Sequence, residues 1–182
     1  MIYMKSVKGT KDLDPSDLLT RSKILTTIRN TYLQTNSMEY QTPILESTNI
    51  LQKKYGDDTI LIFNIENDSS DKEQSSLRYD LTVPLTRYCL KTGFNKGGLF
   101  QIGKVYRMDT PNQDRARYRE FTQCDLDLVG VKENKLLLPE TILLYCGTLI
   151  LKRLGITGWS IKVNHRQCLL DTLSSCGVES SD

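Results

Sequence analysis

The stretch Phe100–Gly130, FQIGKVYRMDTPNQDRARYREFTQCDLDLVG, decides the fold of this chain. Its pattern predicts two β-strands, at residues 99–109 and 118–129, joined by a polar loop. Successive side chains of a strand point to opposite faces. One face of the second strand is largely apolar, with Glu120 as the exception, and the other face is charged. The residues on the charged face are Arg117, Arg119, Phe121, Gln123, Asp125 and Asp127.

The pattern leaves two interpretations of this charged face open. The common one is the solvated face of an antiparallel sheet. The other is a binding surface for an anionic ligand, with Arg107 and Arg117 on either side of the loop as phosphate-binding guanidinium groups and Phe121 as a stacking surface. Alternation of side chains does not separate these two interpretations.

The composition excludes several classes of protein. A chain of 182 residues is long enough for one domain with a good core. The formal net charge of +2 is not that of a general nucleic-acid binder. No stretch has the length and apolarity of a membrane span or a secretory signal, so we expect no membrane partner. Five scattered cysteines and a single histidine, His165, predict reduced thiols and no metal site.

Helices and strands are mixed on both sides of the central stretch. Asp14 and Pro15 form a cap and first turn for a helix that extends to about residue 34. Residues 39–46 are extended, and Pro43 indicates an edge or an interface. A short helix capped by Ser47 and Thr48 is expected to run through Leu51 to Lys54. The other elements expected along the chain are turns at 55–58 and 95–98, strands at 60–65 and 159–164, a polar loop at 67–76, and helices that begin at Pro84, Pro139 and Leu169. This mixture favours an α+β fold with an antiparallel sheet.

Further polar residues are spaced so that they could hold a small ligand. If residues 77–82 are a strand, Asp80 and Thr82 share a face and could bind an ammonium group. Gln123 and Asp127 share the charged face of the later strand. The chain has no glycine-rich phosphate loop, so side chains would have to hold a nucleotide. Without a recognisable serine or cysteine nucleophile, the pattern favours catalysis by positioning and charge stabilisation.

Four stretches carry a family resemblance, and they are KGTKD at 8–12, YQTPILES at 40–47, LRYDLTVPLTRY at 77–88 and the residues from Gly103 to Gly130. They resemble the histidyl-tRNA synthetases of the eukaryotic cytosolic type, which are class II aminoacyl-tRNA synthetases. The resemblance implies a mostly antiparallel sheet flanked by helices and a cytoplasmic location. Motif 1 would lie at about 15–48 and motif 2 at about 99–130. Residues 1–182 would then be an N-terminal portion of the catalytic domain that lacks motif 3 and the anticodon-binding domain.

The resemblance also implies a role for each candidate residue. Arg107 would be the catalytic residue, in contact with the ATP α-phosphate and the histidine carboxylate. The residues implied for ATP are Arg107, Asp109, Arg117 and Phe121, and those implied for histidine are Asp80, Thr82, Arg107, Gln123 and Asp127. Mg²⁺ would accompany ATP, the acceptor end of the tRNA would meet the Thr110–Ala116 loop, and the motif 1 region would form a homodimer.

The implied reaction has two steps. The histidine carboxylate attacks the α-phosphorus of ATP to give histidyl-adenylate and pyrophosphate, and the adenylate then acylates the terminal adenosine of the tRNA. Because half of the ATP site is missing, we expect little adenylation by this chain alone. The alternative is a non-enzymatic synthetase-like module that binds tRNA or a partner enzyme. The presence of all five implied histidine-binding residues favours an enzyme as the parent protein.

Overall fold

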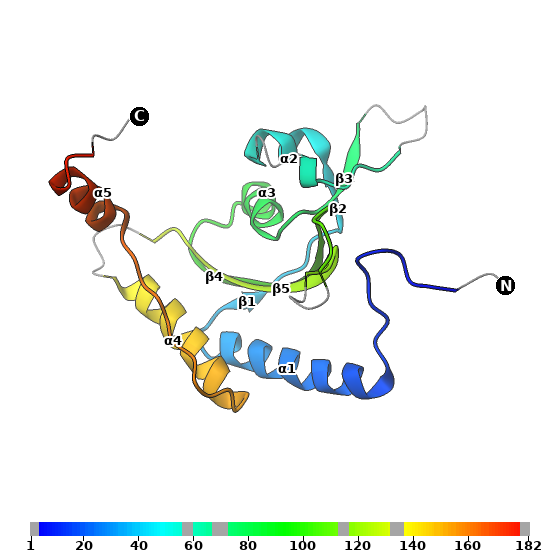
Figure 1. The fold of residues 1–182 in the computed structure, drawn as a ribbon, viewed down its shortest axis with the longest axis horizontal. Helices are drawn as coiled ribbons and strands as arrows, with labels where there is room; N and C mark the ends of the chain where they lie inside the picture. Colours follow the sequence, from blue (N-terminus) through cyan, green and yellow to red (C-terminus); the bar gives the residue numbers. More distant parts are fainter. Residues whose placement is uncertain (1–3, 56–59, 67–72, 113–116, 132–136, 179–182) are drawn as a thin grey trace.

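The structure is a computed structural model that describes residues 4–55, 60–66, 73–112, 117–131 and 137–178. Helices and strands are mixed along the chain without regular alternation (Figure 1). The helices are α1 (Pro15–Leu33), α2 (Thr48–Tyr55), α3 (Thr82–Thr92), α4 (Leu138–Arg153) and α5 (Arg166–Ser175). The strands are β1 (Met38–Glu39), β2 (Leu45–Ser47), β3 (Ser75–Leu77), β4 (Gly97–Tyr106) and β5 (Glu120–Val129).

The predicted pair of long strands is the centre of the fold. β4 and β5 are antiparallel and in register from Gly97 opposite Val129 to Tyr106 opposite Glu120. β1 pairs with the other edge of β4 in parallel, which gives the strand order β1-β4-β5. β2 and β3 form a separate antiparallel pair. The prediction of an antiparallel strand pair is confirmed. β4 ends three residues earlier and β5 begins two residues later than predicted. The parallel strand β1 makes the sheet mixed.

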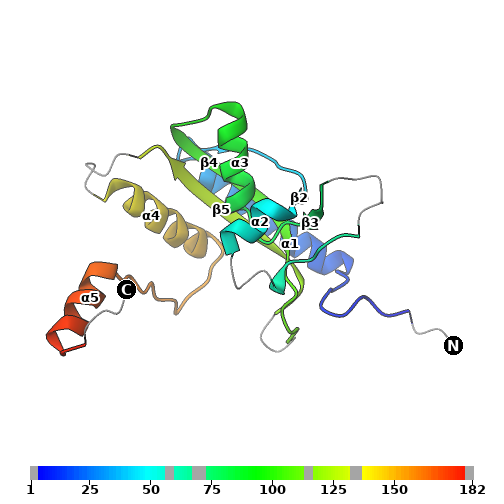
Figure 2. The same cartoon turned by 90° about the horizontal axis from the view of Figure 1, so that it is seen from above.

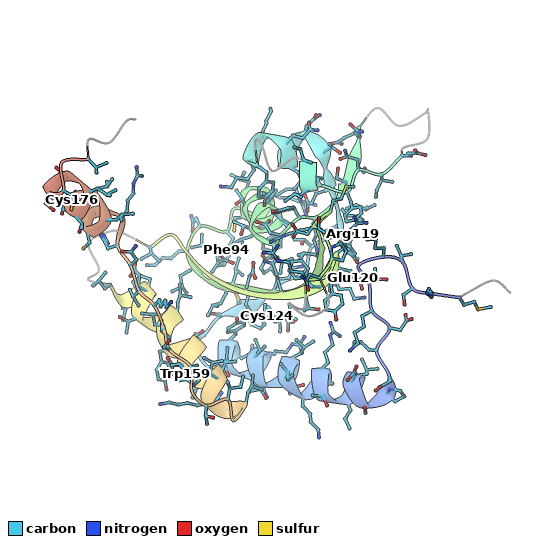
Figure 3. The ribbon with its side chains drawn as sticks, viewed as in Figure 1. Phe94, Arg119, Glu120, Cys124, Trp159 and Cys176 are labelled. Atoms are coloured by element: carbon cyan, nitrogen blue, oxygen red, sulfur yellow. The ribbon has the colours of Figure 1, made fainter. Side chains whose placement is uncertain are left out.

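Helix α1 covers one face of this sheet (Figure 1). The Tyr32 ring packs at 5.3 Å from the Phe100 ring, and the Tyr32 hydroxyl donates a hydrogen bond to the Cys124 carbonyl (2.9 Å). Cys124 lies on the side of the sheet that faces α1 (Figure 3). The helix begins as predicted, because the Asp14 carboxylate accepts a hydrogen bond from the Asp17 N–H. The apolar face of the second strand therefore lies against α1 and is half-buried.

Helices α3 and α2 lie on the opposite side of the sheet (Figure 1). One buried cluster there joins Tyr40, Leu85 and Leu99, and a second joins the α2 and α3 residues Leu51 and Val83 through Ile62. The charged face of the hairpin is therefore partly covered by α3 and by the segment that joins β3 to α3. It is not a plain solvated face.

Three predicted elements are wrong in the described part of the chain. Ile60 and Leu61 form a helical turn, and the rest of the predicted strand makes only an isolated bridge from Asn64 to Ser76. Ser76, which we expected in the polar loop, belongs to β3, whereas residues 67–72 lie outside the described residues. The backbone of 159–164 is irregular and most of its side chains are exposed. An alternating pattern becomes a strand only where a neighbouring strand supplies hydrogen bonds.

Two predicted boundaries also need correction. Pro43 lies between β1 and β2 and belongs to neither strand. The carbonyls of Thr42 and Pro43 face the Arg78 guanidinium instead of a neighbouring strand. At the predicted 95–98 turn, the two glycines already belong to β4. Residues 56–58 of the other predicted turn lie outside the described part of the chain.

The C-terminal helices follow the predicted pattern. α4 packs against the end of α1, where the Arg153 guanidinium donates hydrogen bonds to the side chains of Thr31 (2.9 Å) and Gln34 (2.8 Å). α5 stands apart from the sheet in both ribbon views (Figures 1 and 2). His165, which we expected at the end of a strand, caps this helix by accepting a hydrogen bond from the Gln167 N–H.

Replacing Gly130 with alanine is expected to lower the free energy of unfolding by about 2 kcal/mol. Gly130 directly follows β5 with a φ of +68°, and a Cβ atom there would overlap the carbonyl oxygen of Asn95. Chemical denaturation of the two proteins measures the difference. Gly147→Ala is the matched control, because no atom lies within 4 Å of the added methyl group and its helical position favours alanine. Equal stability of Gly130→Ala and the unchanged protein would contradict this account.

Candidate active site

The strand register brings the predicted face together. Residues directly opposite each other in an antiparallel pair share a face of the sheet. The β4 and β5 pairs on this face are Leu99 with Asp127, Gln101 with Asp125, Gly103 with Gln123 and Val105 with Phe121. The assignment of Phe121, Gln123, Asp125 and Asp127 to one face is therefore confirmed. These side chains lie on the side of the sheet that α3 partly covers.

Arg107 follows β4 directly and lies among aromatic rings. Its guanidinium carbon is 4.3 Å from the centre of the Tyr79 ring and 5.2 Å from that of Phe121. Its Nε donates a hydrogen bond to the Tyr79 carbonyl (3.1 Å), and its backbone N–H donates to the Arg119 carbonyl (2.9 Å). Tyr79 in turn packs on Tyr55, with 4.6 Å between ring centres. These contacts fix the guanidinium, because a planar cation is held both by π faces and by a carbonyl.

Asp80 reaches the same site from the segment between β3 and α3. Its Oδ1 accepts hydrogen bonds from the N–H groups of Thr82 (3.1 Å) and Val83 (3.3 Å) at the start of α3. The prediction that Asp80 and Thr82 share a strand face is therefore wrong. Thr82 is the first residue of α3 and is exposed. The Asp80 carboxylate caps the free N–H groups at the start of α3, and this local hydrogen bonding replaces the strand conformation that the residue spacing predicts.

Two partly buried carboxyl groups lie beside Asp80. Burial, followed by the charges of Asp127 and Asp80, raises the pKa of Asp125 to about 6, while Arg107 opposes the shift. Burial and then Asp80 also raise the pKa of Asp127. Burial removes solvent that would screen the neighbouring charges, so these charges disfavour the ionised forms of Asp125 and Asp127. Asp80, Asp125 and Asp127 therefore form an acidic cluster with the Arg107 guanidinium beside it, and this cluster would favour a ligand that carries a positive charge.

Three buried polar atoms near this acidic cluster lack a hydrogen-bond partner within the described residues. They are the hydroxyls of Tyr40 and Tyr55 and Oε1 of Gln123. Burial, then Asp127 and Asp125, raise the pKa of the Tyr40 hydroxyl, so this group lies close to both carboxyl groups. A buried polar atom without a partner is costly and usually marks a place where a ligand or water binds.

The other predicted site residues lie farther along the hairpin. The Asp109 carbonyl accepts a hydrogen bond from Nε of Arg119 (3.2 Å). Arg117 is exposed and pairs with Asn112 through two backbone hydrogen bonds. No contact joins Arg117 or Asp109 to Arg107 in the described ranges. Residues 113–116 of the proposed tRNA-binding loop lie outside those ranges.

Four residues at the site were not singled out as ligand residues from the sequence. They are Tyr40, Tyr55, Tyr79 and Asp125. The alternation of β5 does assign Asp125 to the correct face, and Tyr79 directly precedes Asp80. Tyr40 and Tyr55 carry no local signal, because they reach the site through the packing of separate elements.

Two negative findings apply to the residues that the structure describes. No group of three or more His, Cys, Asp or Glu side chains there could hold a metal ion. No helix there is long and apolar enough to cross a membrane. The cysteines of the described residues are free, with Cys146 buried and Cys168 and Cys176 exposed.

Comparison with known proteins decides the family. The profile described as tRNA synthetases class II (D, K and N) matches residues 12–146, well over half of the chain. The chain belongs to the class II tRNA synthetases. The resemblance and the fold class inferred from the sequence are thus confirmed at the level of this class.

The class II chain is also similar to histidine–tRNA ligases. The mitochondrial ligase of Saccharomyces cerevisiae is 38% identical over 181 residues, which cover 100% of this chain and 32% of that protein. The cytoplasmic ligase of Takifugu rubripes is 37% identical over 175 residues, covering 96% of this chain and 33% of that protein. The chain therefore spans about a third of the length of these relatives.

Solved structures agree with this similarity. The histidyl-tRNA synthetase from Nostoc sp. PCC 7120 superposes with a TM-score of 0.80 at 25% identity, over 97% of this chain and 40% of that one. A protein from Bacillus halodurans described as an ATP phosphoribosyltransferase regulatory subunit/histidyl-tRNA synthetase gives 0.70 at 21% identity, over 85% of this chain and 39% of that one. At that identity the second match establishes the fold alone.

Proposed function

We propose that this chain is part of the catalytic domain of a histidine–tRNA ligase and forms one wall of its histidine and ATP site. The observation that carries the proposal is that Arg107, Asp80, Gln123 and Asp127 lie together on the side of the sheet that α3 partly covers. Gln123 Oε1 is buried there without a partner among the described residues, and the surrounding charge suits an amino acid with a positive α-ammonium group. The similarity to histidine–tRNA ligases over the whole chain supports histidine as that amino acid.

The proposed chemistry needs positioning more than covalent catalysis. Because Tyr79 engages Nε of Arg107, the terminal nitrogens of this guanidinium are the donors that would meet the histidine carboxylate and the ATP α-phosphate. Their charge would stabilise the additional negative charge that develops as the carboxylate attacks phosphorus and pyrophosphate leaves. Asp80, Thr82 and Gln123 would hold the α-ammonium group, and Asp127 the imidazole ring.

ATP would be held mainly by side chains at the loop end of the hairpin. Phe121 would stack on adenine with the ring face that Arg107 does not cover. Asp109 would lie near the base, and the exposed Arg117 would meet the outer phosphates. Mg²⁺ bound with ATP would offset phosphate charge, and we assign no residue of this chain to it.

The remaining parts of the proposal concern the whole protein. Residues 1–182 would be the N-terminal portion of its catalytic domain, with motif 1 at about 15–48 and motif 2 at about 99–130. A homodimer through the motif 1 region is supported by apolar side chains that remain exposed there, among them Leu19, Met38 and Leu45. The tRNA acceptor end would approach the Thr110–Ala116 loop. A cytoplasmic location is proposed, although both cytoplasmic and mitochondrial ligases are similar.

Replacing Asp127 with alanine tests the enzyme against the alternative of a non-enzymatic module. In the complete product of the open reading frame that encodes this chain, histidine-dependent ATP–pyrophosphate exchange is expected to fall about 100-fold at low histidine concentration, because a charge-assisted contact to the substrate is lost. The exchange rate is measured over a range of histidine concentrations for both proteins.

The control is Asp17→Ala, because Asp17 pairs with Lys11 on the exposed start of α1, away from the acidic cluster. If Asp127→Ala has the same rate of ATP–pyrophosphate exchange as the unchanged protein, the proposed contact between Asp127 and histidine is wrong. Absence of exchange in the unchanged complete protein would favour the regulatory module, whose tRNA binding could then be measured directly.

A further inference from the structure

We propose that Asp125 is an additional substrate-binding residue that pairs with the α-ammonium group of histidine. This inference rests on the proposed function and extends it to a residue that the family resemblance did not assign. Its first support is position. Gln123, Asp125 and Asp127 are alternate residues of β5 on the same face of the sheet.

The spacing of the strand makes Asp125 the floor of the site. Alternate residues of a strand are about 7 Å apart, so Gln123 and Asp127 are separated by about 13 Å with Asp125 midway. A single amino acid held by both outer residues must therefore lie across Asp125. On the neighbouring strand, the residue opposite is Gln101, whose fully buried amide is already engaged by Arg78 and Thr42. The Gln101 amide is therefore already hydrogen-bonded to Arg78 and Thr42, which leaves the Asp125 carboxylate for the ligand.

The charges around Asp125 favour a cation. Asp127 on its own strand and Asp80 at the start of α3 both disfavour its ionised form, and Arg107 at the end of β4 is the cation that opposes them. From the chain after β1, the Tyr40 hydroxyl lies close enough for this carboxyl group to raise its pKa, after burial and Asp127. Three carboxyl groups against one guanidinium leave an excess of negative charge that an ammonium group would neutralise.

A second observation, independent of the acidic residues, indicates that a ligand binds here. Tyr40 is only 7% exposed, yet its hydroxyl has no hydrogen-bond partner among the described residues, and the carboxyl groups of Asp127 and Asp125 are those that affect it most. The nearby Oε1 of Gln123 is buried and unpartnered in the same way. Two buried polar atoms without a partner, beside the same carboxyl groups, indicate a place where a ligand would supply the missing hydrogen bonds.

The test compares histidine with its analogue that lacks the amino group, 3-(imidazol-4-yl)propionate. In the complete gene product, Asp125→Asn is expected to weaken histidine binding by about 10- to 100-fold and binding of the analogue by less than about twofold. The KM for histidine in ATP–pyrophosphate exchange should rise by the same factor, with the KM for ATP unchanged. Asp171→Asn, the same chemical change on the exposed face of α5, is the control.

The pH dependence gives a second readout. Because the pKa of Asp125 is about 6 in the folded protein, its carboxylate forms as the pH rises from 5 to 7.5. The ratio of the histidine dissociation constants of Asp125→Asn and the unchanged protein should therefore increase over this range. The titration of histidine itself cancels in that ratio. A folded-state pKa above the ordinary value also means that ionisation destabilises the fold, so Asp125→Asn should melt higher than the unchanged protein at pH 7.5.

The possible outcomes separate this inference from the proposed function. If the unchanged protein catalyses histidine-dependent exchange and Asp125→Asn binds histidine normally, the inference is wrong and the proposed function stands. Equal weakening for histidine and the analogue would also overturn it, because a damaged fold would explain both. If the unchanged protein has no histidine-dependent activity and no affinity for histidine, the proposed function and this inference fail together.

Discussion

Replacing Arg78 with methionine is expected to lower the free energy of unfolding by about 2–4 kcal/mol. Arg78 is 4% exposed, and its guanidinium donates hydrogen bonds to the carbonyls of Lys104 (2.7 Å) and Thr42 (3.1 Å). With the Gln101 amide oriented to satisfy its neighbours, the amide oxygen accepts a third hydrogen bond from Arg78 Nη1 (3.0 Å). Methionine fills a similar volume but removes the donors that Arg78 supplies to the Lys104 and Thr42 carbonyls.

The loss of stability should exceed that caused by replacing a surface arginine, because Arg78 connects separate parts of the fold. Its backbone N–H donates to the Ile44 carbonyl and its own carbonyl accepts from the Tyr106 N–H, so residue 78 ties the β2–β3 pair to the end of β4. Gly103 is part of the same arrangement, since a Cβ atom there would lie 2.5 Å from Arg78 Nη2. The next two residues along the chain are Tyr79 and Asp80, and both belong to the site.

The measurement is urea denaturation followed by circular dichroism. Arg29→Met is the matched control, since Arg29 pairs with Glu39 while both side chains are about 40% exposed, and such surface pairs contribute roughly 0–1 kcal/mol. Arg78→Lys should fall between the two, because an ammonium group keeps the charge but cannot match the planar fork. Equal losses for Arg78→Met and Arg29→Met would show that the buried hydrogen bonds contribute little net stability.

The sequence predicts those elements whose signal is local. The alternation of residues 99–129 identifies the long hairpin and its two faces, because the partner strand lies close by in the sequence. Asp14 with Pro15 identifies the start of α1 in the same way, since a cap and a first turn involve adjacent residues. Gln123 and Asp127, two of the residues predicted to bind histidine, lie on the face of β5 that the alternation predicts.

The failures concern residues whose conformation depends on distant partners. The alternation of 159–164 is as regular as that of β5, but the structure offers it no strand to pair with within the described residues. The spacing of Asp80 and Thr82 fits a strand, and it gives no sign of the hydrogen bonds that Asp80 accepts at the start of α3. Tyr40 and Tyr79 enter the site through the packing of α3 and the Arg107 contact, neither of which has a signature in the local sequence.

Replacing Arg107 with alanine is expected to reduce the kcat of histidine-dependent ATP–pyrophosphate exchange by about 10³-fold in the complete gene product. The guanidinium is held between the Tyr79 and Phe121 rings and by the Tyr79 carbonyl, so it would meet the transition state without further ordering. Alanine removes the positive charge that would stabilise the developing charge on phosphorus. Because that charge acts mainly in the transition state, kcat should fall more than the KM values change.

Further variants separate charge from geometry at the same position. Arg107→Lys keeps a cation but loses the ring contacts and the planar pair of donors, so its kcat should still fall about 10²-fold. Tyr79→Leu retains the backbone carbonyl and removes one ring face, and we expect a loss of about tenfold in kcat through poorer positioning of Arg107. Arg29→Ala, on the exposed pair with Glu39, should leave exchange unchanged. If Arg107→Ala kept kcat within threefold of the unchanged protein, this residue could not be the group that stabilises phosphoryl transfer, and the catalytic assignment would have to move to another cation of the complete protein.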